Sequence, residues 1–204
     1  MYIPTKKTIL LVIFIALFYN ANSQIKSKFI NNLSIEFGLN WVESSGNQDL
    51  LTIFKDYSDI AFNLPFKVEI GYLVGDSFEL YLAGTTNKFL ENQNIDNRDL
   101  DRPYTYLSVD FGAKYAVFEI DIFTSSVVGF AQGGIGVFKV ESLAVSANIG
   151  AGGVIELSEN IDFVISSVAR FAFKNEPLNS NHLQYSIGLK YRFSDRGSNC
   201  FCPY

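Results

Sequence analysis

The segment from Leu183 to Phe193, LQYSIGLKYRF, alternates between large apolar residues and small or polar ones. Its odd positions are Leu, Tyr, Ile, Leu, Tyr and Phe, and its even positions are Gln, Ser, Gly, Lys and Arg. Successive side chains of a β-strand point to opposite faces of the sheet, so the segment predicts a strand with one apolar and one polar face. A strand of about eleven residues is long enough to cross a bilayer at a tilt.

Seven further segments show the same alternation, which is weakest in the glycine-rich fifth and sixth. They are Leu33–Val42, Ile60–Tyr72, Phe78–Thr86, Tyr104–Tyr115, Ser126–Val140, Ala144–Leu157 and Ile161–Phe173. One such segment is weak evidence, but eight in a row predict an all-β fold, an eight-stranded antiparallel up-and-down transmembrane β-barrel. Pro65 interrupts the second segment, and a closed barrel has no edge strand, so we expect a bulge or a missing ladder bond there. The stretch Phe118–Ser125 either extends the fourth and fifth strands or forms their turn.

The predicted connections differ in length between the two ends of the barrel. Short turns follow the second and sixth strands, whereas long polar links, Glu43–Asp59, Asn87–Pro103 and Lys174–His182, follow the first, third and seventh. Such asymmetry is typical of short periplasmic turns and long extracellular loops. Aromatic residues are expected in a girdle at each end. Tyr72, Phe78, Tyr115, Phe163, Tyr191 and Phe193 fall near the short turns, and Trp41, Phe173 and Tyr185 near the long loops.

The N-terminus has the features of a secretory signal. Lys6 and Lys7 precede the apolar run Ile9–Phe18, and Ala21 and Ser23 suit cleavage after Ser23. Ten apolar residues are too few for a spanning helix. We therefore expect a signal peptide at 1–23, a barrel domain at 24–193 and a short periplasmic tail at 194–204, in a protein exported to the outer membrane of a Gram-negative bacterium.

Composition excludes several classes of protein. The chain is 48% hydrophobic, 15% aromatic and 18% charged, which excludes intrinsic disorder. Without residues 1–23, Lys+Arg falls from 16 to 14 against 21 Asp+Glu, so the formal charge moves from −5 to −7. An acidic chain without a basic cluster predicts no nucleic-acid partner.

The combined pattern resembles the small eight-stranded outer-membrane β-barrels of the OmpA/OmpX type. The resemblance rests on the signal ending ANSQ, the fifth segment GFAQGGIGV and the terminal segment YSIGLKYRF, in which Tyr191 and Phe193 are similar to the signal that the outer-membrane insertion machinery recognises. It implies outer-membrane lipid and that machinery as partners. Only Ser194–Tyr204 follows the last strand, so the peptidoglycan-binding function of larger relatives is not inferred.

The inward positions predict a lumen filled with paired charges, because an eight-stranded barrel is just wide enough for its side chains and buried charges need partners. Glu36 and Lys190 are expected to be neighbours where the first and last strands meet. The predicted inward charges are Glu36, Glu69, Glu79 and Asp110 against Lys67, Lys114, Arg170, Lys190 and Arg192.

No catalytic, cofactor or metal residue is assigned. His182 with Ser180 or Ser186 is a candidate for a rim-active lipid-modifying site, but the sequence shows no orienting acid. The remaining candidates are weaker still. Asp96, Asp99 and Asp101 could suggest calcium, but they lack the EF-hand spacing. Cys200 and Cys202 could suggest zinc, but two thiols do not complete a four-ligand site. The glycine runs 133–136 and 150–153 could suggest phosphate, but neither matches a nucleotide-binding motif.

The pattern therefore favours a non-enzymatic outer-membrane barrel with a charge-paired, largely plugged lumen. It would act in envelope structure or in surface interaction, with an unknown extracellular ligand at its long loops. Three alternatives stay open: the rim-active lipid-modifying enzyme, a narrow channel, and a soluble periplasmic lipocalin-like barrel that binds an apolar ligand.

Overall fold

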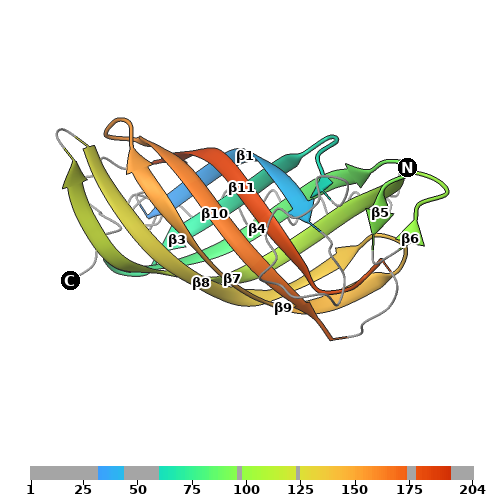
Figure 1. Ribbon diagram of the computed structural model, residues 1–204. Coiled ribbons are helices and arrows are strands. Elements are labelled where there is room, and N and C mark those ends of the chain that lie inside the picture. The colour runs from blue at the N-terminus through green and yellow to red at the C-terminus, as the bar shows by residue number, and fades with distance from the viewer. Residues whose placement is uncertain (1–31, 44–59, 96–97, 123–124, 174–177, 194–204) are drawn as a thin grey trace, which may run out of the picture.

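The computed structural model describes residues 32–43, 60–95, 98–122, 125–173 and 178–193, and these residues form strands and turns only. Figure 1 shows the strands tilted across one barrel. Their bounds are β1 Leu33–Glu43, β2 Ile60–Ala61, β3 Phe66–Leu73, β4 Phe78–Phe89, β5 Asn94–Ile95, β6 Arg98–Asp99, β7 Tyr104–Ile122, β8 Ser125–Lys139, β9 Leu143–Glu156, β10 Ile161–Ala172 and β11 His182–Arg192. The predicted signal peptide and the C-terminal tail with Cys200 and Cys202 lie outside the described residues.

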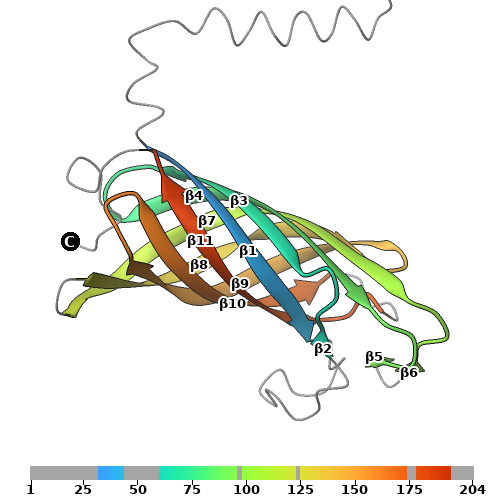
Figure 2. The ribbon, with the colours of Figure 1, turned by 90° about the horizontal axis from the view of Figure 1, so that it is seen from above.

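The sheet closes on itself. Its order is β11-β10-β9-β8-β7-β4-β3-β1, and β11 pairs with β1, all antiparallel (Figure 2). The closing register runs from Ser34 opposite Arg192 to Glu43 opposite Leu183. The prediction of an eight-stranded antiparallel up-and-down barrel is confirmed, with β2 as a short continuation beside β1 and β5–β6 as a separate ribbon.

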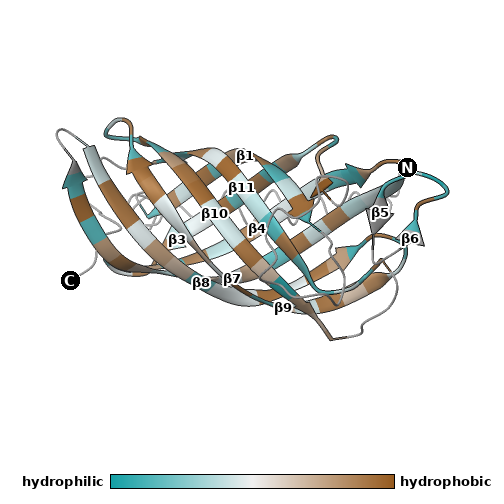
Figure 3. Ribbon diagram, in the orientation of Figure 1, coloured by the Kyte–Doolittle hydropathy of each residue, from teal (hydrophilic) through white to brown (hydrophobic). Residues whose placement is uncertain are grey.

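Burial alternates along the strands in the predicted phase. In β11 every second residue from His182 to Arg192 is buried, whereas Leu189 and Tyr191 are exposed. Phe111 is 54% exposed on β7 and Ile149 is 62% exposed on β9, both on the outer face. Apolar and polar bands accordingly alternate along the ribbon in Figure 3. Since the outside is apolar and the inside polar, the lipocalin-like alternative is wrong.

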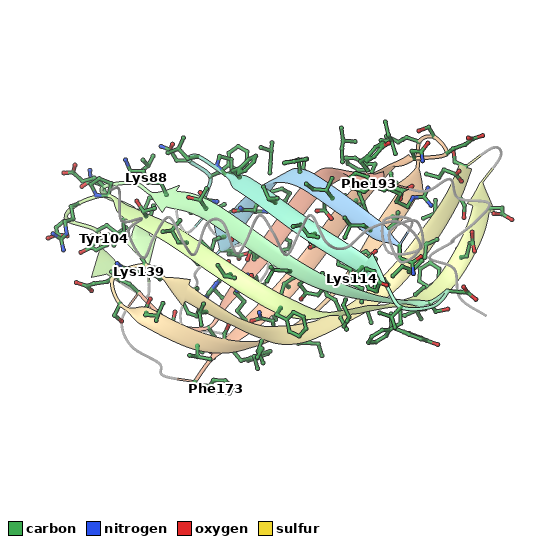
Figure 4. All side chains as sticks on the ribbon, turned by 180° about the vertical axis from the view of Figure 1, so that it is seen from behind. Lys88, Tyr104, Lys114, Lys139, Phe173 and Phe193 are labelled. Atoms are coloured by element: carbon green, nitrogen blue, oxygen red, sulfur yellow. The ribbon has the colours of Figure 1, made fainter. Side chains whose placement is uncertain are left out.

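The connection between β4 and β7, residues 90–103, is longer than the turns at the opposite end of the barrel. We call the end with residues 74–77 and 157–160 the short-turn end, and the opposite one the long-loop end. Figure 4 shows Lys88, Tyr104 and Lys139 at the long-loop end and Phe193 at the short-turn end. Among the described residues, no helix is long and apolar enough to cross a membrane.

The second strand is not continuous, contrary to the prediction of one strand from Ile60 to Tyr72. Residues 62–65 separate β2 from β3, and Leu64 there has a positive φ of 57°. Proline lacks the N–H that a ladder needs, which explains a break rather than a bulged strand. The break leaves Phe62 and Leu64 exposed, at 57% and 68%.

Two buried asparagines replace the missing ladder bonds at this break. The side-chain amide of Asn87 donates to the carbonyls of Asn40 and Ala61, each at 3.0 Å, and its oxygen accepts from the backbone N–H of Asn63 at 3.0 Å. The amide of Asn40 donates to the carbonyl of Phe66 at 2.8 Å. Backbone groups that the break leaves without strand partners are thereby satisfied inside the barrel.

The stretch after Tyr115 extends both neighbouring strands. β7 continues to Ile122 and β8 starts at Ser125, with a register shift between Ala116 and Phe118. The extra residue of such a β-bulge lets the strand bend and twist locally.

Candidate functional site

Among the described residues, ten buried charged side chains occupy inward strand positions, five acidic and five basic, so their formal charges cancel. The acidic ones are Glu36, Glu69, Glu79, Asp110 and Asp162, and the basic ones are Lys67, Lys114, Arg170, Lys190 and Arg192. All of them except Asp162 are among the inward charges predicted from the sequence, although the position of Asp162 in Ile161–Phe173 is inward by the same alternation. Counting Asp162 corrects the expected four-against-five balance to five against five. An eleventh buried charge, Glu43, is at the outward phase at the end of β1, where it accepts a hydrogen bond from Tyr185.

Three lysines and three glutamates form one cluster, to which β1, β3, β4, β7 and β11 contribute. Lys67 Nζ lies 2.7 Å from Glu36 and 3.0 Å from Glu69. Lys114 donates to Glu69, and its Nζ also lies 3.9 Å from both Glu36 and Glu79. Since three lysines face three glutamates, the formal charges of the cluster cancel, and each lysine has a carboxylate within reach, as buried charges require.

The predicted neighbours Glu36 and Lys190 do lie opposite each other at the β1–β11 seam. The ion pairs run differently, because Lys190 donates to Glu79 on β4 and Glu36 accepts from Lys67 on β3. An inward side chain in a narrow barrel can reach a strand that is not its neighbour, so the register alone does not determine its partner.

A second network joins β7 to β10 across the lumen. The Arg170 guanidinium binds both carboxylate oxygens of Asp110, at 2.6 and 2.5 Å. Asn148 donates to Asp110 at 2.8 Å, and the Arg170 Nε donates to Gln184 at 2.9 Å. This planar two-bond pairing is the strongest geometry available to an arginine and a carboxylate. Gly136 makes room for it, since a Cβ there would lie 2.0 Å from the Asp110 oxygen.

A separate ion pair lies toward the short-turn end, where Arg192 Nε is 3.0 Å from Asp162. Arg192 also donates to the Glu159 carbonyl at 3.0 Å. The pair therefore ties the last strand to the β9–β10 turn.

Two buried apolar clusters also lie along the lumen, one toward each end. At the long-loop end, Phe89, Tyr106 and Phe138 belong to a buried cluster with Val42, Ala61, Leu100, Val140, Ala144 and Leu178. Toward the short-turn end, Val128, Phe130 and Val164 pack with Leu73, Ala116 and Val154. Between the two main ionic networks lies a cavity of about 30 Å³, lined by Glu69, Asp110 and Arg170 among others. That volume suits one or two water molecules.

His182 points into the lumen rather than toward the rim. Its Nε2 is 3.0 Å from the Tyr106 hydroxyl, and its Nδ1 is 3.0 Å from the Ser180 carbonyl. The ring packs against Phe138 with centroids 4.8 Å apart. The Ser186 hydroxyl lies 2.8 Å from the Ser166 hydroxyl instead. Both ring nitrogens are therefore engaged by groups other than a serine hydroxyl, and the imidazole is not placed as a base for one.

The described residues show no metal or phosphate site at the other candidates from the sequence. Asp99 and Asp101 are exposed, and Asp96 lies outside the described residues. Within the described ranges, no three His, Cys, Asp or Glu side chains are grouped to hold a metal ion. The glycine runs lie in β8 and β9 rather than at the start of a helix, as a nucleotide loop requires.

Taken together, the closed sheet, the apolar exterior and the charge-paired interior define a small eight-stranded membrane β-barrel. No protein-family model and no curated protein sequence matches the chain. The N-terminal β-barrel domain of Pseudomonas aeruginosa OprF superposes with a TM-score of 0.50 at 14% identity, covering 79% of this chain and 97% of that one.

Two more solved barrels are similar at lower scores. Neisserial surface protein A has a TM-score of 0.49 at 15% identity, covering 78% of this chain and 95% of that one. Ail, the attachment invasion locus protein of Yersinia pestis, has a TM-score of 0.41 at 16% identity, with the same coverage. At 14% identity, the likeness to the OprF barrel domain shows the fold alone, that of a small outer-membrane barrel.

Proposed function

We propose that this protein is a non-enzymatic outer-membrane barrel, exported through an N-terminal signal, whose lumen is closed to ions. Its role is in envelope structure or in surface interaction through the long loops. The observation that carries the proposal is the lumen itself, in which five inward carboxylates meet five inward cations and two apolar clusters fill further space.

The arrangement of the interior supports a structural rather than a conducting lumen. Ion-selective pores present rings of one charge sign along a continuous aqueous path. Here the Asp110–Arg170 pair spans from β7 to β10, and the apolar cluster of Phe89, Tyr106 and Phe138 lies between that pair and the long-loop end. A permeating ion would have to separate the Asp110–Arg170 pair and pass through the apolar cluster.

The environment of His182 favours the non-enzymatic proposal over the lipid-modifying alternative. The imidazole is 3% exposed and is held by Tyr106 and the Ser180 carbonyl. An enzyme acting on lipid needs its nucleophile and base within reach of the substrate, at the outer rim.

The experiment is single-channel recording in planar bilayers with the purified, refolded barrel. The proposal predicts no stable conductance steps from the wild type. Arg170→Met with Asp110→Asn should stay closed, because the apolar clusters remain. Regular unit steps from the wild type, altered by Arg170→Met, would overturn the closed lumen in favour of the narrow channel.

The surface role requires a separate measurement, because it concerns the long loops. Binding of intact bacteria that carry the barrel to immobilised extracellular matrix or host proteins should exceed binding of bacteria that lack it. Replacing loop residues 90–103 by a short turn should reduce this binding, while the barrel still folds. Equal binding with and without the barrel would leave envelope structure as its role.

A further inference from the structure

The outer wall carries an apolar groove of about 490 Å³ over β9, β10, β11 and β1. Its lining includes the aromatic rings of Trp41 and Tyr185 and the aliphatic Ile165 and Ile187. It also includes the small β9 residues Ala151 and Gly153, which we call the floor. No charged residue lines it. The small outward residues Ala151 and Gly153 of β9 thus share this face of the wall with Tyr185 of β11 and Trp41 of β1, with β10 between β9 and β11.

The aromatic side of the groove is held in place by its own contacts. Trp41 stacks on Tyr185 with ring centroids 5.7 Å apart, and the edge of Phe62 meets Trp41 at 6.4 Å. The Tyr185 hydroxyl donates to Glu43 at 3.3 Å. Restrained side chains lose little freedom when a ligand lies against them, so the groove is preorganised.

The glycine on the floor is not required by the fold. A Cβ on Gly153 would meet its nearest atoms at 3.9 Å, an ordinary van der Waals distance. On neighbouring Gly152, by contrast, a Cβ would lie 2.4 Å from the Ile165 carbonyl. The absence of a side chain at Gly153 therefore deepens the groove without relieving any clash inside the protein.

We propose that this groove holds one acyl chain of a membrane lipid from the leaflet at the long-loop end. It is continuous with the lipid-facing surface of the barrel, so lipid chains are the molecules beside it. Trp41 lies near the long-loop end of β1, so the groove leads from that interface toward the middle of the wall. This inference goes beyond the proposed function and holds whether or not the lumen conducts.

Trp41 is the only tryptophan of the chain and lines the groove, so its fluorescence reports the occupant. The barrel, folded in a short-chain detergent, is titrated with a phospholipid whose acyl chain carries bromine, which quenches tryptophan on contact. The proposal predicts saturable quenching at a lipid fraction several-fold below that needed for random contact. An excess of the unbrominated lipid should reverse it.

Gly153→Leu fills the floor and should return quenching to simple proportion with the lipid fraction. Ala151→Leu is a second filling variant. The control is Gly84→Leu on β4, which β3 separates from β1 and which β7 and β8 separate from β9. A Cβ there meets nothing within 4 Å, and the variant should match the wild type. A heat-dependent gel shift verifies that each variant is folded.

Identical, proportional quenching in the wild type and Gly153→Leu would overturn the proposal and leave ordinary lipid contact. Weak quenching with cross-linked dimers that Gly153→Leu abolishes would also overturn it, in favour of a second copy of the chain in the groove.

Discussion

Removing either Arg170 or Asp110 alone should lower the free energy of unfolding strongly. Removing both should lower it by less than the sum of the two single losses. In Arg170→Met, the Asp110 carboxylate keeps only neutral donors, such as Asn148 at 2.8 Å and Ser108 at 3.1 Å. A buried charge that loses its partner costs about 3–5 kcal/mol in the free energy of unfolding. Asp110→Asn alone should cost about 3 kcal/mol, because Arg170 then lacks its counter-charge.

In the double variant neither charge remains, and much of the loss should be recovered. We expect an interaction free energy of about 2–3 kcal/mol from the double-mutant cycle. The assay is urea unfolding of the folded barrel in lipid vesicles, followed by the fluorescence of Trp41. Losses that simply add, with an interaction below about 0.5 kcal/mol, would refute the pairing.

A matched cycle controls for general effects of losing charge. Arg192 belongs to the separate pair with Asp162, so Arg192→Met combined with Asp110→Asn should be additive within about 0.5 kcal/mol. Equal interaction free energies in both cycles would mean that the coupling is general to the charged interior and not specific to the Arg170–Asp110 pair.

Three further predictions concern single positions. Asn87→Ala should lower the free energy of unfolding by about 3 kcal/mol, because backbone groups at the β2–β3 break lose their hydrogen-bond partners. An unchanged midpoint of urea unfolding would contradict the role given to this amide. Gly136→Ala should cost about 2 kcal/mol through its clash with Asp110, whereas Gly84→Ala should be neutral, and equal midpoints for the two would count against the packing described. Overproduction of the wild type and of His182→Ala should give the same envelope lipid composition by mass spectrometry, and a lipid change seen with the wild type alone would indicate an enzyme.

The strands and their facing could be predicted because they follow from alternation within each segment. The inward and outward residues of Leu183–Phe193 are assigned correctly, as is the meeting of Glu36 and Lys190 at the seam. A period of two is local, and a barrel must bury one face of every strand, so sequence is sufficient.

The partners inside the lumen could not be predicted in the same way. Whether Lys190 meets Glu36 or Glu79 depends on side-chain reach across a curved wall, which alternation does not encode. The break at residues 62–65 was signalled by Pro65, but its repair by Asn40 and Asn87 involves residues distant in sequence. The groove was also missed, because its walls and floor come from four strands.

The central claim is that the chain forms a lipid-embedded barrel, and the most direct test uses washed outer membranes of cells that express it. Samples in detergent are run on gels with and without boiling. The account predicts recovery in the membrane fraction and a faster-migrating folded form that disappears on boiling. Recovery in the soluble periplasm, with no shift on boiling, would contradict it.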